Sequence, residues 1–238
     1  TDGGTKTEIT GATFTVGTPA YFMQIAGYLY IANGTDPLAR YDGSTLTTYT
    51  QINAPTGLTG TATSSISAVS GVSIYGIVTA LNSVGETIGS SEVQVYVNKI
   101  RDQWNKDTDK ITWSWSAVSG VDRYQLYISD TQGYEELLTS VTGTSFTDDG
   151  TLATNPYIAV PLDNTTAAPK FKSMVVSGNR IWATNNPSSP YTVYFSGTGQ
   201  YMGVFSDFYG GGWINLEKGG RETPVKVVHY QSGQGEGR

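Results

Sequence analysis

Histidine and cysteine, the residue types that most often supply catalytic bases and soft metal ligands, are almost missing from this sequence. His229 is the only histidine and there is no cysteine. A Ser-His-Asp arrangement needs its histidine held rigidly between nucleophile and carboxylate, and His229 lies in a strand-like run close to the end of the sequence. A zinc site needs several nitrogen or sulfur ligands. We therefore predict neither chemistry here.

Paired carboxylates are the remaining catalytic option, because glycoside hydrolysis uses two of them and needs no histidine. The candidate pairs are Glu135-Glu136, Asp148-Asp149 and Asp107 with Asp109. Adjacent residues of a strand point to opposite faces of the sheet. The Asp-Asp-Gly at 148–150 is typical of a turn, and the last pair lies in a polar loop whose spacing matches no calcium-binding loop. We predict that the protein is not an enzyme, with no catalytic residue, metal or cofactor.

Aromatic side chains are abundant and gather in the stretch GQYMGVFSDFYGGGWINL, residues 199–216. The aromatic residues of this stretch are Tyr201, Phe205, Phe208, Tyr209 and Trp213. Such rings stack on sugars or bases, but Tyr and Trp are also enriched in cores and at subunit interfaces. We favour an interface or core role for them and keep ligand stacking as the alternative.

The composition predicts an all-β protein that does not grip nucleic acid. There are 29 Gly and 16 Tyr among 238 residues, and short alternating runs end repeatedly in turn residues, which indicates many short strands. The formal net charge is −6, and the basic residues are scattered. A phosphate-binding protein concentrates positive charge on one face. No apolar run approaches the ~20 residues that span a bilayer.

Residues 1–52 and 165–238 carry two similar hairpin patterns. In the first, strands at 22–25 and 28–31 flank Ala26-Gly27, and further strands are expected at 39–41 and 46–49. In the second, strands at 174–176 and 180–183 flank a turn at 177–179, and a third is expected at 191–195. Aligning Gly27 with Gly178 pairs Met23 with Met174 and requires one inserted residue before the second strand. Four short strands joined by tight turns have the size of one propeller blade.

Residues 53–164 have a different character. Apolar and polar residues alternate at 111–116 and at 124–128, as in strands of a sandwich whose two inner faces meet. Trp115, Tyr124 and Leu126 are predicted core residues of this sandwich. Subtracting the ~110 residues of this segment leaves the two hairpin patterns one blade period apart. We therefore expect a sandwich inserted between neighbouring blades of one β domain.

The inserted segment resembles a fibronectin type III domain. The stretch ITWSWSAVSGVDRYQLYI, residues 111–128, is similar to the tryptophan strand, glycine turn and tyrosine strand of that family. The stretch YGIVTALNSVGETIGS, residues 75–90, is similar to its Tyr-x-Val-x-Ala-x-Asn-x-x-Gly-Glu stretch. The tryptophan strand comes second here, whereas it comes first in the family, which indicates a permuted or divergent variant.

The flanking segments resemble bacteriophage tail proteins of the β-propeller type, including tail hub, nozzle and DNA-stabilising proteins. YLYIANGTDPLARYDG (residues 28–43), NRIWATNNPSSPYTVYFSGTGQ (179–200) and GGGWINLEKGGRETPVKVV (210–228) carry this resemblance. It implies propeller-type antiparallel blades, incomplete in this chain, interrupted by the fibronectin type III-like sandwich. It further implies a homo-oligomeric ring in the virion, in contact with other tail or neck proteins, with DNA passing nearby and no sequence-specific binding.

These observations lead to a structural role in a phage tail, at the hub, nozzle or neck, as the main hypothesis. The alternative is an extracellular or cell-surface carbohydrate-binding adhesin, because sandwich and propeller folds both host sugar sites. Exposed Trp or Tyr rings beside Asp or Asn in a groove favour the adhesin, whereas rings buried between subunits favour assembly.

Overall fold

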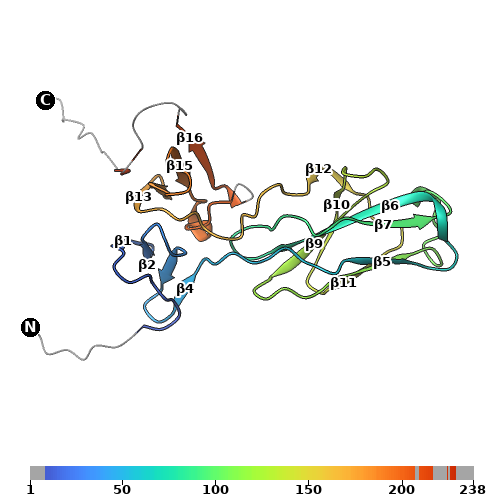
Figure 1. Cartoon of the computed structure of the whole chain (residues 1–238), viewed down its shortest axis with the longest axis horizontal. Coiled ribbons are helices and arrows are strands. Elements are labelled where there is room, and N and C mark those ends of the chain that lie inside the picture. Colours follow the sequence, from blue (N-terminus) through green and yellow to red (C-terminus); the bar gives the residue numbers. More distant parts are fainter. Residues whose placement is uncertain (1–8, 207–208, 217–223, 225, 229–238) are drawn as a thin grey trace, which may run out of the picture. The chain divides into compact units, whose positions relative to one another are not determined.

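The computed structural model describes residues 9–206, 209–216, 224 and 226–228. In these residues the strands form four antiparallel sheets, joined by loops and two short 3-10 helices (Figure 1). This confirms the predicted all-β class. Contacts divide the chain into two compact units, one formed by Thr1–Thr50 with Ala167–Arg238 and the other by Gln51–Thr166. No helix of the described residues is long and apolar enough to cross a membrane.

The first unit contains two sheets of four strands, each arranged in chain order. The strands of the first sheet are β1 (Tyr21–Ile25), β2 (Tyr28–Ala32), β3 (Ala39–Tyr41) and β4 (Leu46–Thr48). Those of the second sheet are β13 (Ser173–Ser177), β14 (Arg180–Thr184), β15 (Thr192–Phe195) and β16 (Gly212–Asn215). A 3-10 turn, η2 (Gly199–Tyr201), lies in the connection between β15 and β16. The seven strands expected from the two hairpin patterns are all present, and no bound is shifted by more than one residue.

The opening hairpins of the two sheets are equivalent, which corrects the predicted alignment between them. In both, a two-residue turn has positive φ at each position: 50° and 82° at Ala26-Gly27, 59° and 58° at Gly178-Asn179. This is the turn that matches the twist of a hairpin. The residues correspond at a constant spacing with no insertion, so Met23 matches Val175 instead of Met174. Glycine was a misleading anchor because Asn179 tolerates the same backbone conformation.

The core of the first unit lies where the β15–β16 connection meets the first sheet. The Tyr30 hydroxyl donates to the backbone oxygen of Met202 at 2.9 Å, and Gly203 lies against the rings of Tyr30 and Tyr49. Phe171 and Phe205 pack edge to face, with ring centroids 5.2 Å apart. Strands β1 and β13 also contact each other. The two sheets are therefore held in one unit by contacts between residues far apart in sequence.

The second unit is a sandwich of a five-stranded and a three-stranded sheet, in the strand orders β12-β10-β9-β6-β7 and β11-β8-β5. The larger sheet contains β6 (Ser67–Leu81), β7 (Val93–Val97), β9 (Arg123–Ser129), β10 (Glu136–Val141) and β12 (Asn155–Ala159). The smaller contains β5 (Thr59–Ala62), β8 (Ile111–Ser114) and β11 (Ser145–Asp148). A 3-10 turn, η1 (Arg101–Gln103), follows β7.

Tryptophan side chains fill the centre of the sandwich. Trp113 is completely buried, and Trp115, Tyr124 and Leu126 belong to the same cluster. Trp115 and Tyr124 pack edge to face at 5.5 Å. Gly60 on the adjacent strand β5 and Gly76 on β6 of the facing sheet leave room for the Trp113 ring. The large ring therefore fits between the sheets because both the strand beside it and the strand facing it carry no side chain there.

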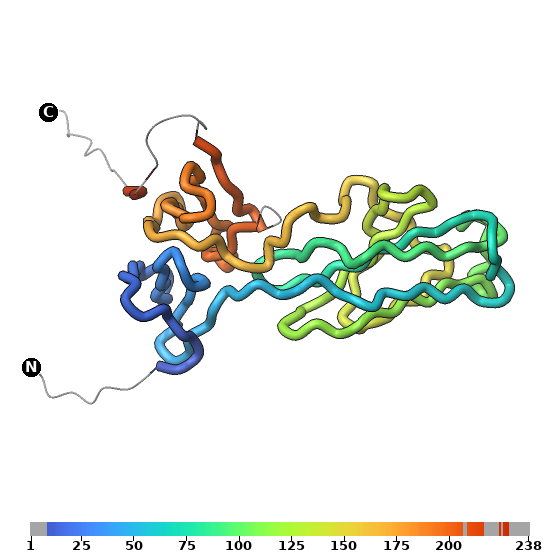
Figure 2. Tube along the Cα trace, in the orientation of Figure 1, coloured from blue at the N-terminus to red at the C-terminus, as the bar shows by residue number. Residues whose placement is uncertain are grey.

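The chain leaves the first unit after residue 50 and returns to it at residue 167, so the sandwich is entered and left at one place (Figure 2). There the Ile52 amide donates to Thr166 Oγ1 at 3.0 Å, and Asn164 Nδ2 donates to the Ile52 backbone oxygen at 2.8 Å. Asn82 Nδ2 donates to the Thr166 backbone oxygen at 2.9 Å. Two chain ends held side by side make insertion of a domain tolerable.

Substituting Gly76→Ala tests the role of the glycine gap in the sandwich core. A Cβ at this position would lie 2.5 Å from Cζ3 of Trp113, and overpacking of this kind typically costs about 1–3 kcal/mol. We expect a lower midpoint of urea unfolding for the sandwich. Gly143→Ala is the control, because a Cβ there meets nothing within 4 Å. Equal stability of the two variants would contradict the argument.

Candidate functional site

The carboxylates of the polar loop at 104–110 have separate structural roles. Asp109 is buried and forms an ion pair with Lys99, Nζ to Oδ2 at 2.5 Å, and it accepts a hydrogen bond from the Asn105 amide at 2.7 Å. The Lys99 ammonium, helped by that amide, holds the pKa of Asp109 well below its usual range. Asp107 is exposed. One of the two carboxylates therefore closes the loop, and they do not face a common cleft.

The two adjacent carboxylate pairs are likewise divided. Glu135 is buried and accepts from the Gly133 amide at 3.3 Å, whereas Glu136 accepts from Thr154 Oγ1 at 2.6 Å. Asp148 is buried in a two-bond ion pair with Arg101, at 2.8 Å from Nε and 2.6 Å from Nη2. Its neighbour Asp149 is tied to Thr151. Hydrogen bonds from Thr151 lower the pKa of Asp149. Each of these carboxylates thus has its own partner.

Histidine and metal chemistry receive no support from the geometry. His229 lies outside the described residues. Among the residues that the structure does describe, no group of three or more His, Cys, Asp or Glu side chains is placed to hold a metal ion.

The five aromatic residues of the 199–216 stretch do not form one surface. Tyr201 and Tyr209 are half-buried and stack on each other, with ring centroids 4.8 Å apart. Phe205 is buried against Phe171 in the core of the first unit. Trp213 is 52% exposed, and Phe208 lies outside the described residues. The stretch is therefore mostly internal packing, with Trp213 as its exposed member.

A second apolar surface, absent from the sequence analysis, lies on the second sheet of the first unit. Strand register places five apolar side chains on one face, which we call the Trp182 face: Val175, Trp182, Val193, Phe195 and Ile214. The Trp182 and Phe195 rings lie 5.4 Å apart, both half-buried, and Ile214 is 48% exposed. The opposite face carries the fully buried Ile181 and Ala183. This sheet thus buries one face within the unit and leaves an apolar one only partly covered.

The first sheet is divided in the same manner. Tyr30 points into the unit core, and its register partner Arg40 stacks on Tyr28 with 4.5 Å between the guanidinium carbon and the ring centroid. On the other face Phe22 is 64% exposed and the neighbouring Ile31 is half-buried. Exposed apolar sheet faces of this kind mark interaction surfaces more often than scattered single residues do.

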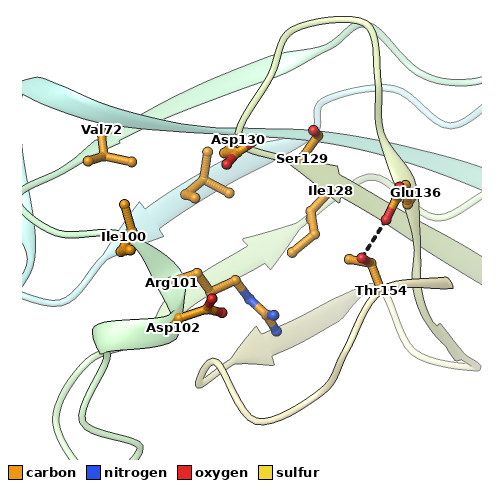
Figure 3. A pocket seen from close by; sticks show the side chains of 10 residues that line it. Val72, Ile100, Arg101, Asp102, Ile128, Ser129, Asp130, Glu136 and Thr154 are labelled. Atoms are coloured by element: carbon orange, nitrogen blue, oxygen red, sulfur yellow. Dashed lines mark hydrogen bonds between the residues drawn. The ribbon is translucent and has the colours of Figure 1, made fainter. Parts of the chain in front are cut away.

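The sandwich contains a cleft of about 300 Å³ beside the end of β9 (Figure 3). Its apolar lining is formed by Val72, Ile74, Ile100 and Ile128, of which Ile74 and Ile128 are almost completely buried. Its polar lining is formed by Arg101, Asp102, Ser129, Asp130, Glu136 and Thr154. As Figure 3 shows, Glu136 and Thr154 lie on the side opposite Val72 and Ile100. The cleft is thus apolar below and largely acidic around its opening.

The outer face of the larger sandwich sheet holds a buried carboxyl group that the sequence analysis did not identify. Glu86 is 8% exposed, and its Oε1 accepts from Thr79 Oγ1 at 2.5 Å and from the Tyr127 hydroxyl at 2.7 Å. Burial raises the pKa of Glu86, and these two hydroxyls together with the Arg123 charge partly oppose that shift. The Glu86 amide donates to Thr165 Oγ1 at 3.0 Å. The Glu86 backbone thus contacts the return segment that closes the sandwich, while its carboxyl group links β6 and β9 through Thr79 and Tyr127.

No protein-family model matches the sequence, and no curated protein matches it either.

Substituting Glu86→Gln tests the buried carboxyl group through the pH dependence of unfolding. The ordinary pKa is 4.5, and burial raises it in the folded state. As pH rises, Glu86 therefore loses its proton in the unfolded chain before it does so in the folded protein. The free energy of unfolding falls from about pH 4.5 up to the pKa of the folded state and stays at the lower value above it. Because Gln cannot ionise and keeps an acceptor oxygen, the variant should gain stability over the wild type as pH rises from 4 to 7.

Urea unfolding measured across that pH range checks this expectation. Asp122→Asn removes an exposed carboxylate of the same unit and serves as the control, which should follow the wild-type profile. A Glu86→Gln profile parallel to that of the wild type would show that Glu86 ionises equally in the folded and unfolded states.

Proposed function

We propose that this chain is a structural component of a phage tail, at the hub, nozzle or neck, and that it acts by self-association. The partly covered apolar faces of the two sheets in the first unit carry this proposal. In each sheet one face packs against the core of the unit, and the other face presents apolar side chains. The most exposed of these side chains are Phe22 in the first sheet and Ile214 in the second. Aromatic and aliphatic side chains of this type contribute to binding because a protein partner removes them from water.

A homo-oligomeric ring is part of the proposal. A contact between unlike surfaces of identical copies closes into a ring if the rotation between the copies is suitable. The Trp182 face of one copy and the first-sheet face that carries Phe22 and Ile31 of the next copy are two such surfaces. Assembly of this ring in the virion, next to other tail or neck proteins, is part of the proposal. The net charge of −6 suits a wall that DNA passes without sequence-specific binding.

The separate carboxylate partners and the mostly internal aromatic stretch support assembly over the two other function classes. Catalysis of glycoside hydrolysis needs two carboxyl groups across one cleft. The two adjacent pairs named from the sequence do not supply them, because the members of each pair are held by different partners. A sugar-stacking groove needs exposed rings. In the 199–216 stretch, Tyr201 and Tyr209 cover each other and Phe205 is buried, so Trp213 is the one exposed ring among its described residues.

The oligomeric state of the full chain tests the proposal. We expect light scattering and electron microscopy to show an assembly of defined symmetry at micromolar concentration. The double substitution Phe22→Ser with Ile214→Ser should weaken assembly by tenfold or more, since loss of a central apolar anchor costs about 2 kcal/mol or more. The exposure of both side chains, 64% and 48%, limits the effect on folding.

Tyr157→Ser provides the matched control, because Tyr157 is 94% exposed but belongs to the sandwich unit. This variant should assemble as the wild type does. A chain that stays monomeric at every concentration, or a double variant that assembles normally, would contradict the proposal.

A further inference from the structure

The cleft beside β9 has the shape and chemistry of a site for one long side chain. Its volume of about 300 Å³ is at the lower limit of small-molecule pockets. Ile74 and Ile128 are almost completely buried, so they present an apolar floor at the bottom of the cleft. An occupant therefore needs an apolar stem for this floor.

The acidic side chains of the lining determine which charge a bound side chain should carry. Arg101 is already paired with Asp148 through two hydrogen bonds. The three carboxylates of the lining, Asp102, Asp130 and Glu136, form no ion pair with any described residue. Asp130 accepts only from its neighbour Thr131, and Glu136 from Thr154. A cationic group at the opening would meet uncompensated negative charge at the end of an apolar channel.

The open edge of β6 indicates how such a side chain is delivered. The ladder between β6 and β9 begins at the pair Tyr75–Ser129, and β9 ends at Ser129. On that side, residues 72–74 of β6 have no strand partner in the described part of the chain, and a bulge interrupts the strand between Ser67 and Val72. Val72 and Ile74, which line the cleft, belong to this open segment. An exposed strand edge accepts an extended segment of another polypeptide through main-chain hydrogen bonds.

We propose that the cleft binds a lysine or arginine side chain carried by an extended segment of a protein partner. The methylene groups of such a side chain cover the floor, and its charged end lies among Asp102, Asp130 and Glu136. The backbone of the segment runs along the open edge of β6. This interaction belongs to the sandwich unit and does not depend on self-association of the first unit.

Three short peptides probe the site on the full chain. Acetyl-Thr-Val-Lys-Val-Thr-amide and the same peptide with arginine at its centre present the predicted side chain. A third peptide with norleucine at the centre keeps the apolar stem and lacks the charge. Saturation-transfer difference NMR observes the peptides directly, so it reports binding for a monomer and for a large assembly alike.

We expect both basic peptides to bind in the millimolar range or more tightly, and the norleucine peptide to bind about fivefold more weakly or worse. Asp130→Asn with Glu136→Gln should weaken the basic peptides to the level of the norleucine peptide, while Gln still accepts the Thr154 hydrogen bond. Asp122→Asn is the control, because Asp122 is an exposed carboxylate just before the other end of β9. Added salt should weaken only the basic peptides.

Three results would overturn the proposal. The first is equal binding of the lysine and norleucine peptides, which would remove the role of charge. The second is unchanged binding to the double variant, or no binding at about 10 mM peptide, which would remove the site. The third is binding of free lysine amide as tight as that of the peptide, which would identify a small-cation site and exclude recognition of an extended segment.

Discussion

A β-sheet has two faces, and when one face is buried in a core the other must be covered by another segment or remain exposed. In the sandwich the inner faces meet around Trp113, and the outer face of the larger sheet is covered in part by the return segment at 160–166. In the first unit each sheet buries one face against the core and keeps an apolar second face only partly covered. Hydrophobic burial is the dominant driving force of folding and of most association. The same requirement thus shapes the cores and leaves the surfaces on which the proposed assembly rests.

Hydrogen bonds hold the two ends of the inserted sandwich, a segment of about a hundred residues, next to each other. Hydrogen bonds join the entering residue Ile52 to Asn164 and Thr166, and Asn82 and Glu86 bind the same return segment from within the sandwich. Because the two ends of the insertion lie side by side, it adds little loop-closure entropy to the first unit. The Glu86 carboxyl group itself accepts hydrogen bonds from Thr79 and Tyr127 within the sheet, and these two hydroxyls offset in part the desolvation that raises its pKa.

Two sets of acidic side chains in the sandwich differ in burial and in their partners. Asp109 and Asp148 are buried, and each is matched by a cation, Lys99 and Arg101 respectively. A buried charge without such a partner is expensive, so these pairs are part of the fold. The carboxylates at the opening of the cleft remain in contact with water, where an unpaired charge costs little. Their lack of a cation is therefore compatible with stability and leaves them available to a partner.

The sequence by itself determined the all-β class and most strands of the first unit, because alternation and turn residues such as Ala26-Gly27 act over a few neighbouring positions. Even there, the register of the two hairpins followed from the backbone conformation of Asn179 and was not visible in residue identity. Tertiary structure alone decided that Phe205 is internal while Trp213 is exposed. It also decided that Glu86 meets Tyr127 and that Val72 meets Ile128 in one cleft. Such pairs lie 40 or more residues apart, and their proximity depends on which strands become neighbours, a property that local patterns do not encode.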